Sequence, residues 1–295
     1  MTIDIMLPFW GEPELLYRTV ASVRAQTVGD WRLTVIDDAY PDTAVADHFA
    51  RLDDPRVHYV RHPSNVGIVE NFRDSVRRAT ADHLMILGSD DLLLPGYVEA
   101  MTAAISRHPR ASIIQPGVRV IDEHDALALP LTDRVKQGLL RPKTEHGDVI
   151  LAGEELATSL LRGNWLYWPS LLFRTEAIRA HEFRDDLPIV LDLALLVDIA
   201  FAGGELVVID DEVFCYRRHS ASASQRTILD GSRFTDDRRF FQETADRAAA
   251  AGWRSASRAA RLRLFSRLHA LSALPEVIRS GDAAGRRAVW SHILR

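Results

Sequence analysis

The chain has 295 residues, which is long enough for one large domain or for one domain with an appendage. Its composition, 47% hydrophobic and 26% charged, is typical of a globular protein, and its single cysteine, Cys215, excludes an internal disulfide and a multi-cysteine zinc site. Residues 1–232 carry 35 acidic and 23 basic side chains, a balance that disfavours a nucleic-acid-binding groove.

The first 115 residues alternate short β-branched runs with amphipathic stretches. The runs predict strands at residues 2–7, 32–36, 57–61, 83–87 and 112–115. The stretches between them repeat apolar residues three and four apart, which predicts helices at 12–25, 43–52, 67–78 and 96–107. This alternation predicts βαβ units and a mostly parallel sheet, in which ligands bind beyond the carboxyl ends of the strands.

The pattern is less regular after residue 115. Residues 116–150 are rich in Pro, Gly and charged side chains and predict an irregular segment, whose residues 129–150 are either a lid over a ligand or an ordinary surface insertion. Helices are expected near 154–161 and at 190–201, and strands near 170–174 and at 206–209 and 213–217. After residue 231 the chain is expected to be helical to its end.

Acidic side chains follow two of the predicted strands. Asp37 and Asp38 end one strand, where they either accept hydrogen bonds from a ligand or cap a turn and a helix. Asp90 and Asp91 end another, after Ser89. Adjacent carboxylates repel each other, which favours a nearby cation such as Mg²⁺ or Mn²⁺, and a helix cap is the alternative.

Two later motifs carry further candidates. Asp192 opens the apolar helix predicted at 190–201, where it is either a general base or a first-turn acid favoured by the helix dipole. His219 follows a predicted strand and lies between arginines and serines. It is either a ligand of a metal or phosphate or an ordinary surface histidine.

Taken in chain order, these motifs resemble those of family 2 glycosyltransferases over about residues 1–224. The matching motifs are Pro8-Phe9-Trp10-Gly11-Glu12, Val35-Ile36-Asp37-Asp38, Asn65-Val66-Gly67 with Asn71, Leu87-Gly88-Ser89-Asp90-Asp91, the Asp192 helix ending at Gly203-Gly204, and Tyr216-Arg217-Arg218-His219. The resemblance implies a GT-A fold of the α/β class, a Rossmann-like, mostly parallel sheet with flanking helices. It implies a glycosyltransferase domain at 1–232, with a nucleotide-sugar-binding half at 1–115 and an acceptor-binding half at 116–232, and a C-terminal helical region at 233–295.

The resemblance also implies roles for individual residues. Asp192 matches the catalytic aspartate, and Asp91 and His219 match the ligands of a divalent metal, Mn²⁺ or Mg²⁺, with Asp91 the more direct ligand of the acid pair. The residues implied to bind the nucleotide-sugar are Pro8, Phe9, Trp10, Glu12, Asp38, Asn65, Asn71, Ser89 and Asp90.

Several positions depart from the family pattern. Gly88 stands where many members carry the first Asp of the DxD motif, which weakens the expected metal binding. Leu191 replaces the usual Glu before the catalytic Asp, Gly11 replaces a frequent Asn, and Ala39-Tyr40 replaces a frequent Gly-Ser. These departures leave open a catalytically silent protein that binds a nucleotide-sugar or supports assembly.

The reaction implied by the resemblance is inverting transfer of a sugar from a nucleotide diphosphate, UDP before dTDP or GDP, to an acceptor hydroxyl. A nucleotidyltransferase is a less favoured enzyme, because residues 1–30 have no lysine and few glycines for a phosphate loop. A dinucleotide oxidoreductase is disfavoured, because no Gly-x-Gly-x-x-Gly follows the first predicted strand.

The acceptor is expected to be a sugar, a lipid-linked molecule or a small molecule. Trp165 and Trp168 either stack against it or fill the core. Residues 253–271 predict a basic amphipathic helix that either lies on anionic lipid or packs on its own domain or on a second subunit. Because residues 1–10 lack the basic segment of a signal peptide, we expect a cytoplasmic protein, peripheral to the inner face of the membrane if the lipid interpretation holds.

Overall fold

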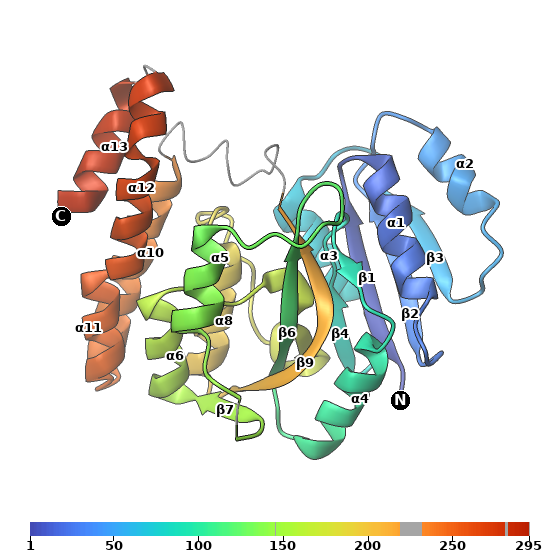
Figure 1. Ribbon diagram of the computed structural model, residues 1–295, viewed down its shortest axis with the longest axis horizontal. Coiled ribbons are helices and arrows are strands. Elements are labelled where there is room, and N and C mark those ends of the chain that lie inside the picture. The colour runs from blue at the N-terminus through green and yellow to red at the C-terminus, as the bar shows by residue number, and fades with distance from the viewer. Residues whose placement is uncertain (145, 219–231, 281–282, 295) are drawn as a thin grey trace.

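The computed structural model describes residues 1–144, 146–218, 232–280 and 283–294. In this part of the chain a nine-stranded sheet has the order β3-β2-β1-β4-β8-β6-β9-β5, with β7 pairing β9 outside this path, and helices flank the sheet (Figure 1). The strands are β1 (Ile3–Phe9), β2 (Trp31–Asp37), β3 (Val57–Arg61), β4 (His83–Ile86), β5 (Leu92–Leu93), β6 (Ile113–Ile121), β7 (Val149–Ala152), β8 (Leu172–Arg174) and β9 (Glu205–Arg217).

The N-terminal half of the sheet is parallel, as predicted. Strands β3, β2, β1 and β4 pair in parallel, and β4 is buried at every position, which explains its continuous apolar run. The helices between these strands are α1 (Pro13–Arg24), α2 (Ala44–Ala50) and α3 (Ile68–Arg78), and α4 (Tyr97–Arg107) follows β5. The connections bring the carboxyl ends of these strands to one edge of the sheet.

The second half of the sheet is mixed and more regular than predicted. β6 runs to Ile121, and the two strands expected at 206–209 and 213–217 are one strand, β9. The register between β6 and β9 shifts at Gly117, where a Cβ would lie 2.9 Å from the Asp210 carbonyl oxygen. The exposed acids at 210–212 lie at this bulge and interrupt the apolar pattern of the strand. The sequence therefore predicts two strands, whereas the backbone forms one continuous strand.

The helical elements of the second half lie between β6 and β9 in the chain. The segment 116–150, expected to be irregular, contains α5 and a π-helical turn, and β7 ends it. The helical elements are α5 (Leu131–Val135), the π-helix Lys136–Leu140, α6 (Gly153–Arg162), the 3₁₀ turn Trp168–Ser170, α7 (Thr175–Arg179) and α8 (Leu191–Phe201). A tight turn at 202–204, with Gly203 at φ +86°, joins α8 to β9 and reverses the chain.

The C-terminal region is helical, as expected, with α10 (Ser232–Ala250), α11 (Arg254–Leu262), α12 (Leu264–Ser280) and α13 (Ala283–Leu294). Phe240 of α10 and Ala260 of α11 belong to the same apolar core as α6 and α8, and Trp253 stacks on Phe201 with 4.4 Å between ring centroids. The single basic helix predicted at 253–271 is two helices that meet at Arg263, where φ is +46°. Its α11 part packs on its own protein, whereas three leucines of the α12 part are exposed: Leu264, Leu268 and Leu271. Among the described residues, no helix combines the length and apolarity needed to cross a bilayer.

Candidate active site

One edge of the sheet collects the ends of several elements that carry candidate residues. β9 is parallel to β6, and β8 is antiparallel to both β6 and β4, so β9 points in the same direction as β4 and β1. The turn between α8 and β9 reverses the chain, so α8 begins toward the edge at which β9 ends (Figure 1). Elements that end or begin at this edge therefore carry Phe9, Asp37, Arg217 and Asp192, and Asp90 lies in the turn after β4.

The end of β1 presents one exposed aromatic ring. Phe9 is fully buried, whereas the next residue, Trp10, is 53% exposed. Tyr40 lies between them, with ring centroids 5.1 Å from Phe9 and 5.6 Å from Trp10. Tyr40 belongs to one of the departures from the family pattern, and it supports the Trp10 ring from one side.

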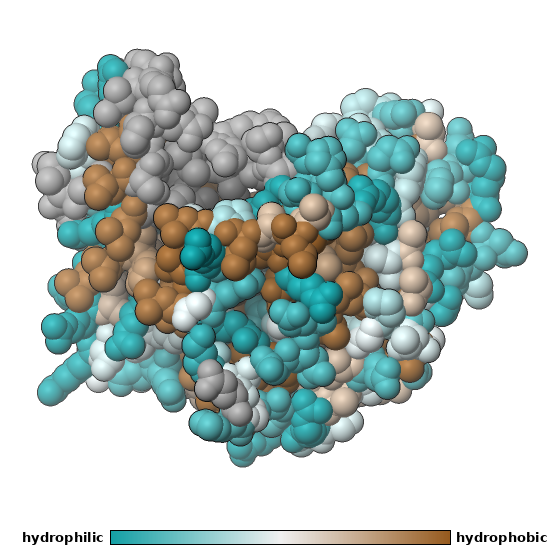
Figure 2. Space-filling view, viewed as in Figure 1, coloured by the Kyte–Doolittle hydropathy of each residue, from teal (hydrophilic) through white to brown (hydrophobic). Residues whose placement is uncertain are grey.

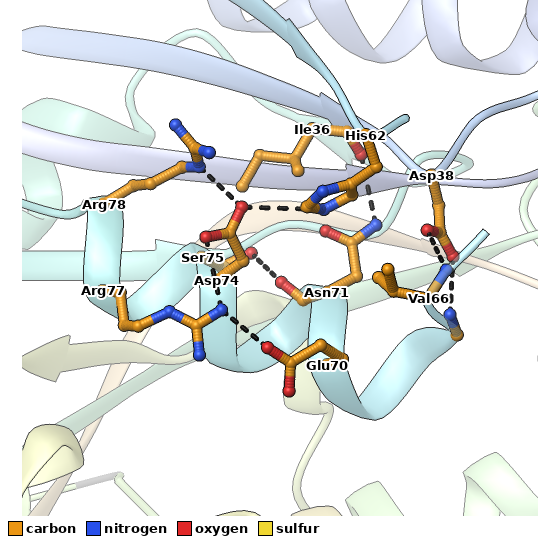
Figure 3. A network of polar contacts seen from close by, with 11 residues as sticks. Ile36, Asp38, His62, Val66, Glu70, Asn71, Asp74, Ser75, Arg77 and Arg78 are labelled. Carbon is orange, nitrogen blue, oxygen red and sulfur yellow. Dashed lines mark hydrogen bonds and ion pairs between the residues drawn. The ribbon is translucent and has the colours of Figure 1, made fainter. Parts of the chain in front are cut away.

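Asp38 holds the loop that leads into α3 (Figure 3). Its carboxylate accepts hydrogen bonds from the backbone N–H groups of Val66 at 2.7 Å and Gly67 at 2.9 Å, and the Asn65 amide donates to the Asp38 carbonyl at 3.3 Å. The side chain is 2% exposed. The Asp38 carboxylate thus accepts loop N–H groups and is not a side-chain cap of α2 or α3, and a role toward a nucleoside stays a prediction.

Asn71 ties α3 to the end of β2 (Figure 3). Its side-chain N–H donates to the Ile36 carbonyl at 3.2 Å, and its Oδ1 is buried with no hydrogen-bond partner among the described residues. Beside it, His62 lies 3.6 Å from the Asp74 carboxylate, which also accepts from Arg78 at 2.6 Å. A buried acceptor without a partner is costly, which favours a water or a ligand donor at Asn71.

The Asp37 carboxylate accepts hydrogen bonds from donors of the protein itself. The fully buried carboxylate accepts from the Tyr40 N–H at 2.7 Å, from the Tyr59 hydroxyl and from Arg61 at 2.6 Å. Burial and the Asp37 hydrogen bond raise the pKa of Tyr59 to about 12. This network fixes the turn that positions Asp38, in which Ala39 has φ +57°.

Asp91 turns inward at the end of β4. Its carboxylate, 1% exposed, accepts the Arg217 backbone N–H at 2.8 Å. Burial and the neighbouring Asp90 carboxylate raise the pKa of Asp91 well above its usual value. A Cβ at Gly88 would lie 2.5 Å from Asp91 Oδ2, so the missing side chain at Gly88 makes room for this carboxylate. Asp90 is the more accessible acid of the two, and the role of Asp91 as the more direct metal ligand stays a prediction.

The acid pair fits a divalent cation in its chemistry. Carboxylate oxygens suit Mg²⁺ and Mn²⁺, and the raised pKa of Asp91, caused by burial and then by Asp90, indicates that nearby cations do not fully compensate the pair. Among the described residues, no group of three or more His, Cys, Asp or Glu side chains is arranged to hold a metal. The remaining ligands would therefore be substrate oxygens, water or His219, which lies outside the described residues.

Arg217 is a site residue for which the sequence analysis proposed no role. Its guanidinium is buried, donates to the carbonyls of Asp90 at 2.7 Å and Asp122 at 2.8 Å, and pairs with Asp125 at 2.6 Å. Arg217 thus joins the end of β9 both to the acid pair and to the turn after β6. The signal in the sequence was the arginine pair before His219, whose partners lie far away along the chain.

Arg218 joins β9 to α5. Its guanidinium donates to both carboxylate oxygens of Asp133, at 3.1 and 2.9 Å, and the Tyr167 hydroxyl donates to the same carboxylate at 2.9 Å. Asp133 is fully buried. This contact fastens α5, part of the segment expected to be a lid or an insertion, beside the end of β9.

Asp192 lies half-buried in the first turn of α8. The preceding Leu191, which replaces the usual Glu, is 7% exposed and packs in the core. α10 covers the segment that leads to this helix, since Arg184 pairs with Glu243 at 2.8 Å and the Asp236 carboxylate accepts the Ile189 N–H.

Trp165 and Trp168 pack into the core. Trp165 is 1% exposed and donates its Nε1–H to Ser159 at 3.0 Å, so its ring offers no face to an acceptor. Trp168 is half-buried, with its ring 6.0 Å from and nearly parallel to that of Phe72. Their positions favour the interpretation that these rings fill the core rather than stack on an acceptor.

The remaining predicted donor residues differ in exposure. Glu12 and Asn65 are exposed, whereas Pro8 and Ser89 are half-buried. The Ser89 hydroxyl lies 3.7 Å from the point where a Cβ at Gly11 would stand, so the turns after β1 and β4 meet there.

The family model for glycosyl transferase family 2 matches residues 4–154, about half of the chain. The chain belongs to glycosyl transferase family 2. The structure of TarS 1-349 from S. aureus in complex with UDP-GlcNAc is similar over 99% of this chain and 89% of that chain, with a TM-score of 0.71 at 12% identity. The GT-A fold implied by the resemblance is thus confirmed for this family 2 protein.

Curated relatives match part of the chain. The putative glycosyltransferase EpsE of Bacillus subtilis is 20% identical over 161 residues, 53% of this chain and 58% of EpsE. The putative colanic acid biosynthesis glycosyl transferase WcaA of Escherichia coli is 24% identical over 102 residues, 34% of this chain and 37% of WcaA. The matches therefore span less than two thirds of the length of either relative.

Proposed function

We propose that this family 2 protein transfers a sugar from a UDP-sugar to an acceptor hydroxyl with inversion at the anomeric carbon. The observation that carries the proposal is the sheet edge, where Trp10 and the Asp90–Asp91 pair follow the adjacent strands β1 and β4 and toward which the Asp192 helix begins. The likeness to TarS, solved with UDP and with UDP-GlcNAc, supports a UDP-sugar as the donor.

The nucleoside would bind at the ends of β1 and β2. Trp10 presents an exposed ring on which a planar base can stack, and Tyr40 supports that ring. The buried Oδ1 of Asn71 and the Asp38 carboxylate are acceptors beside the same turn, and base or ribose donors would complete their hydrogen bonding.

The diphosphate would lie over the end of β4. Asp90, with Asp91 behind it, would hold the Mn²⁺ or Mg²⁺ ion. When bound, such an ion supplies positive charge that stabilises the leaving diphosphate. Arg217 keeps the acid pair in position through its bonds to Asp91 and to the Asp90 carbonyl.

Asp192 would act as the general base. The acceptor oxygen attacks the anomeric carbon opposite the leaving group, a new C–O bond forms, and the bond to the diphosphate breaks with oxocarbenium character. The acceptor proton moves to the Asp192 carboxylate, and UDP leaves with the bonding electrons. The acceptor is a sugar, a lipid-linked molecule or a small molecule with a free hydroxyl.

Thermal unfolding of the purified chain with UDP, dTDP, GDP or CDP, each with Mn²⁺, Mg²⁺ or EDTA, tests the donor site. A ligand at a hundredfold excess over its dissociation constant adds about 2.7 kcal/mol of stability, so UDP with metal should raise the melting temperature clearly. Trp10→Ala should lose this shift, whereas Trp290→Ala, at an exposed tryptophan of α13, should keep it.

The outcomes separate the alternatives. If none of the nucleotides shifts the melting temperature, the proposed donor site is wrong. If UDP binds but no UDP-sugar is turned over with any offered acceptor, the catalytically silent binding protein replaces the enzyme. A shift that persists in EDTA would show that the diphosphate is bound without the metal.

A further inference from the structure

An exposed apolar band crosses one face of the molecule. We define the apolar band by seven leucines that are 49–77% exposed: Leu127, Leu129, Leu131, Leu139, Leu264, Leu268 and Leu271. The first four flank or belong to α5 and the π-helix, and the last three repeat on α12 at spacings of four and three residues. Figure 2 shows hydrophobic surface from the C-terminal helices across the region of α5 toward the sheet edge.

The two parts of the apolar band are adjacent in space. The point where a Cβ at Gly163 would stand is 2.7 Å from Leu140 Cδ1 and 3.2 Å from Phe265 Cγ. Leu140 ends the π-helix beside Leu139, and Phe265 follows Leu264 in α12. The leucines of the segment 127–139 and those of α12 thus form one surface, where monomeric proteins rarely leave large apolar patches uncovered.

Within residues 126–144, the segment of the apolar band around α5 and the π-helix, basic side chains outnumber acidic ones. Residues 126–144 contain Arg134, Lys136, Arg141 and Lys143, which include both lysines of the chain. Their single acid, Asp133, is fully buried against Arg218. Arg134 and Lys143 are exposed beside the leucines of this segment, whereas Arg141 donates to the Ile209 carbonyl.

Polar contacts hold α5 and the π-helix, which carry part of the apolar band, against β9 and β6. Asp133 fastens α5 to Arg218 at the end of β9, and Gln137 of the π-helix donates to the Val118 carbonyl at 2.9 Å. Because these polar contacts point inward, Leu131 and Leu139 point outward, 73% and 71% exposed.

We propose that the apolar band docks on the surface of an anionic phospholipid bilayer. Leucines at the acyl boundary and Lys or Arg side chains at the phosphate level are the arrangement by which interfacial segments bind such membranes.

Docking in this orientation puts the ends of β6 and β9 next to the bilayer. This orientation favours an acceptor carried on a lipid, an inference that rests on the proposed function. The docking itself does not depend on the transfer reaction, so the two proposals fail separately.

Vesicle flotation at low salt tests the docking directly. The full chain should float with vesicles of phosphatidylcholine and phosphatidylglycerol in equal parts, and it should not float with phosphatidylcholine alone. Leu131→Asp/Leu139→Asp removes two leucines and adds two negative charges, and it should weaken binding at least about tenfold. The matched control is Ile150→Asp, at an exposed residue of β7 outside the apolar band, and it should bind as the unchanged chain does.

Each outcome decides the proposal. The melting temperature of each variant without ligand reports whether the fold is intact, so lost flotation with an unchanged melting temperature supports docking through the apolar band. If the unchanged chain does not float with anionic vesicles, or if the double variant floats equally well, the proposal is overturned. It is also overturned if the chain is a dimer in sedimentation, the double variant makes it monomeric, and neither protein floats.

Discussion

The Asp91 carboxylate fills the space that a side chain at Gly88 would occupy, with Oδ2 2.5 Å from the position of a Cβ there. In this position it accepts the Arg217 N–H at 2.8 Å and links the end of β4 to the end of β9. Gly88, which replaces the family's usual acid, thus leaves the space into which the Asp91 side chain points. Asp90 is left as the more accessible carboxylate.

Gly88→Ala should destabilise the protein for this reason. The added methyl group displaces the buried Asp91 carboxylate and breaks its hydrogen bond, which should lower the free energy of unfolding by about 1–3 kcal/mol in urea titrations. Gly96→Ala is the matched control, because a Cβ there would meet its nearest atom at 3.9 Å, and it should change stability by less than about 0.5 kcal/mol. Equal stabilities for the two variants would show that Asp91 moves without cost.

Asp192→Asn should lower turnover about 10²–10⁴-fold while the UDP-dependent thermal shift is kept, because the variant cannot accept the acceptor proton. Asp198→Asn changes the other acid of α8, which pairs with Arg247, and should leave turnover near normal. Steady-state rates of UDP release compare the two. Near-normal turnover of Asp192→Asn would falsify its assignment as the base.

The Asp133–Arg218 pair should respond unequally to loss of either partner. Arg218→Met leaves the fully buried Asp133 carboxylate with the Tyr167 hydroxyl but without its cation, and should cost about 3–5 kcal/mol of unfolding free energy. Asp133→Asn leaves an arginine side chain that is 35% exposed and can reach water, so its cost should be smaller. Urea unfolding of both variants measures the difference, and the reverse order would contradict this account.

Tyr59→Phe should reveal a pH-dependent contribution. Burial and the hydrogen bond to Asp37 raise the pKa of Tyr59 to about 12, so the stabilisation is complete below the unfolded value of about 10 and is lost as the pH rises toward 12. Below pH 10 the variant should be less stable by about 1–2 kcal/mol, because Asp37 loses a buried donor. Unfolding free energies of both proteins from neutral pH to pH 12 should converge, and a constant gap would exclude this linkage.

Some features of the fold were predictable because they depend on neighbours along the chain. The runs that became β1 to β4 and the helices between them carry their periodicity within about ten residues, and they formed close to the expected bounds. β9 was split in the prediction because three exposed acids at a bulge look like a loop when the partner strand β6 is not known. α5 was missed because it is five residues long and is held by Arg218 from another part of the chain.

The sequence alone determined the class of fold, the family resemblance and the acids at the strand ends, because periodicity and short motifs depend on residues that are close together along the chain. The tertiary structure decided what those acids do in the folded chain. Asp38 accepts N–H groups 28 and 29 residues away, and Asp91 accepts one 126 residues away. Such partners meet only when the sheet is assembled, since burial sets which carboxylate turns inward and which stays accessible. The same assembly buries Asp133 and leaves the leucines around it exposed.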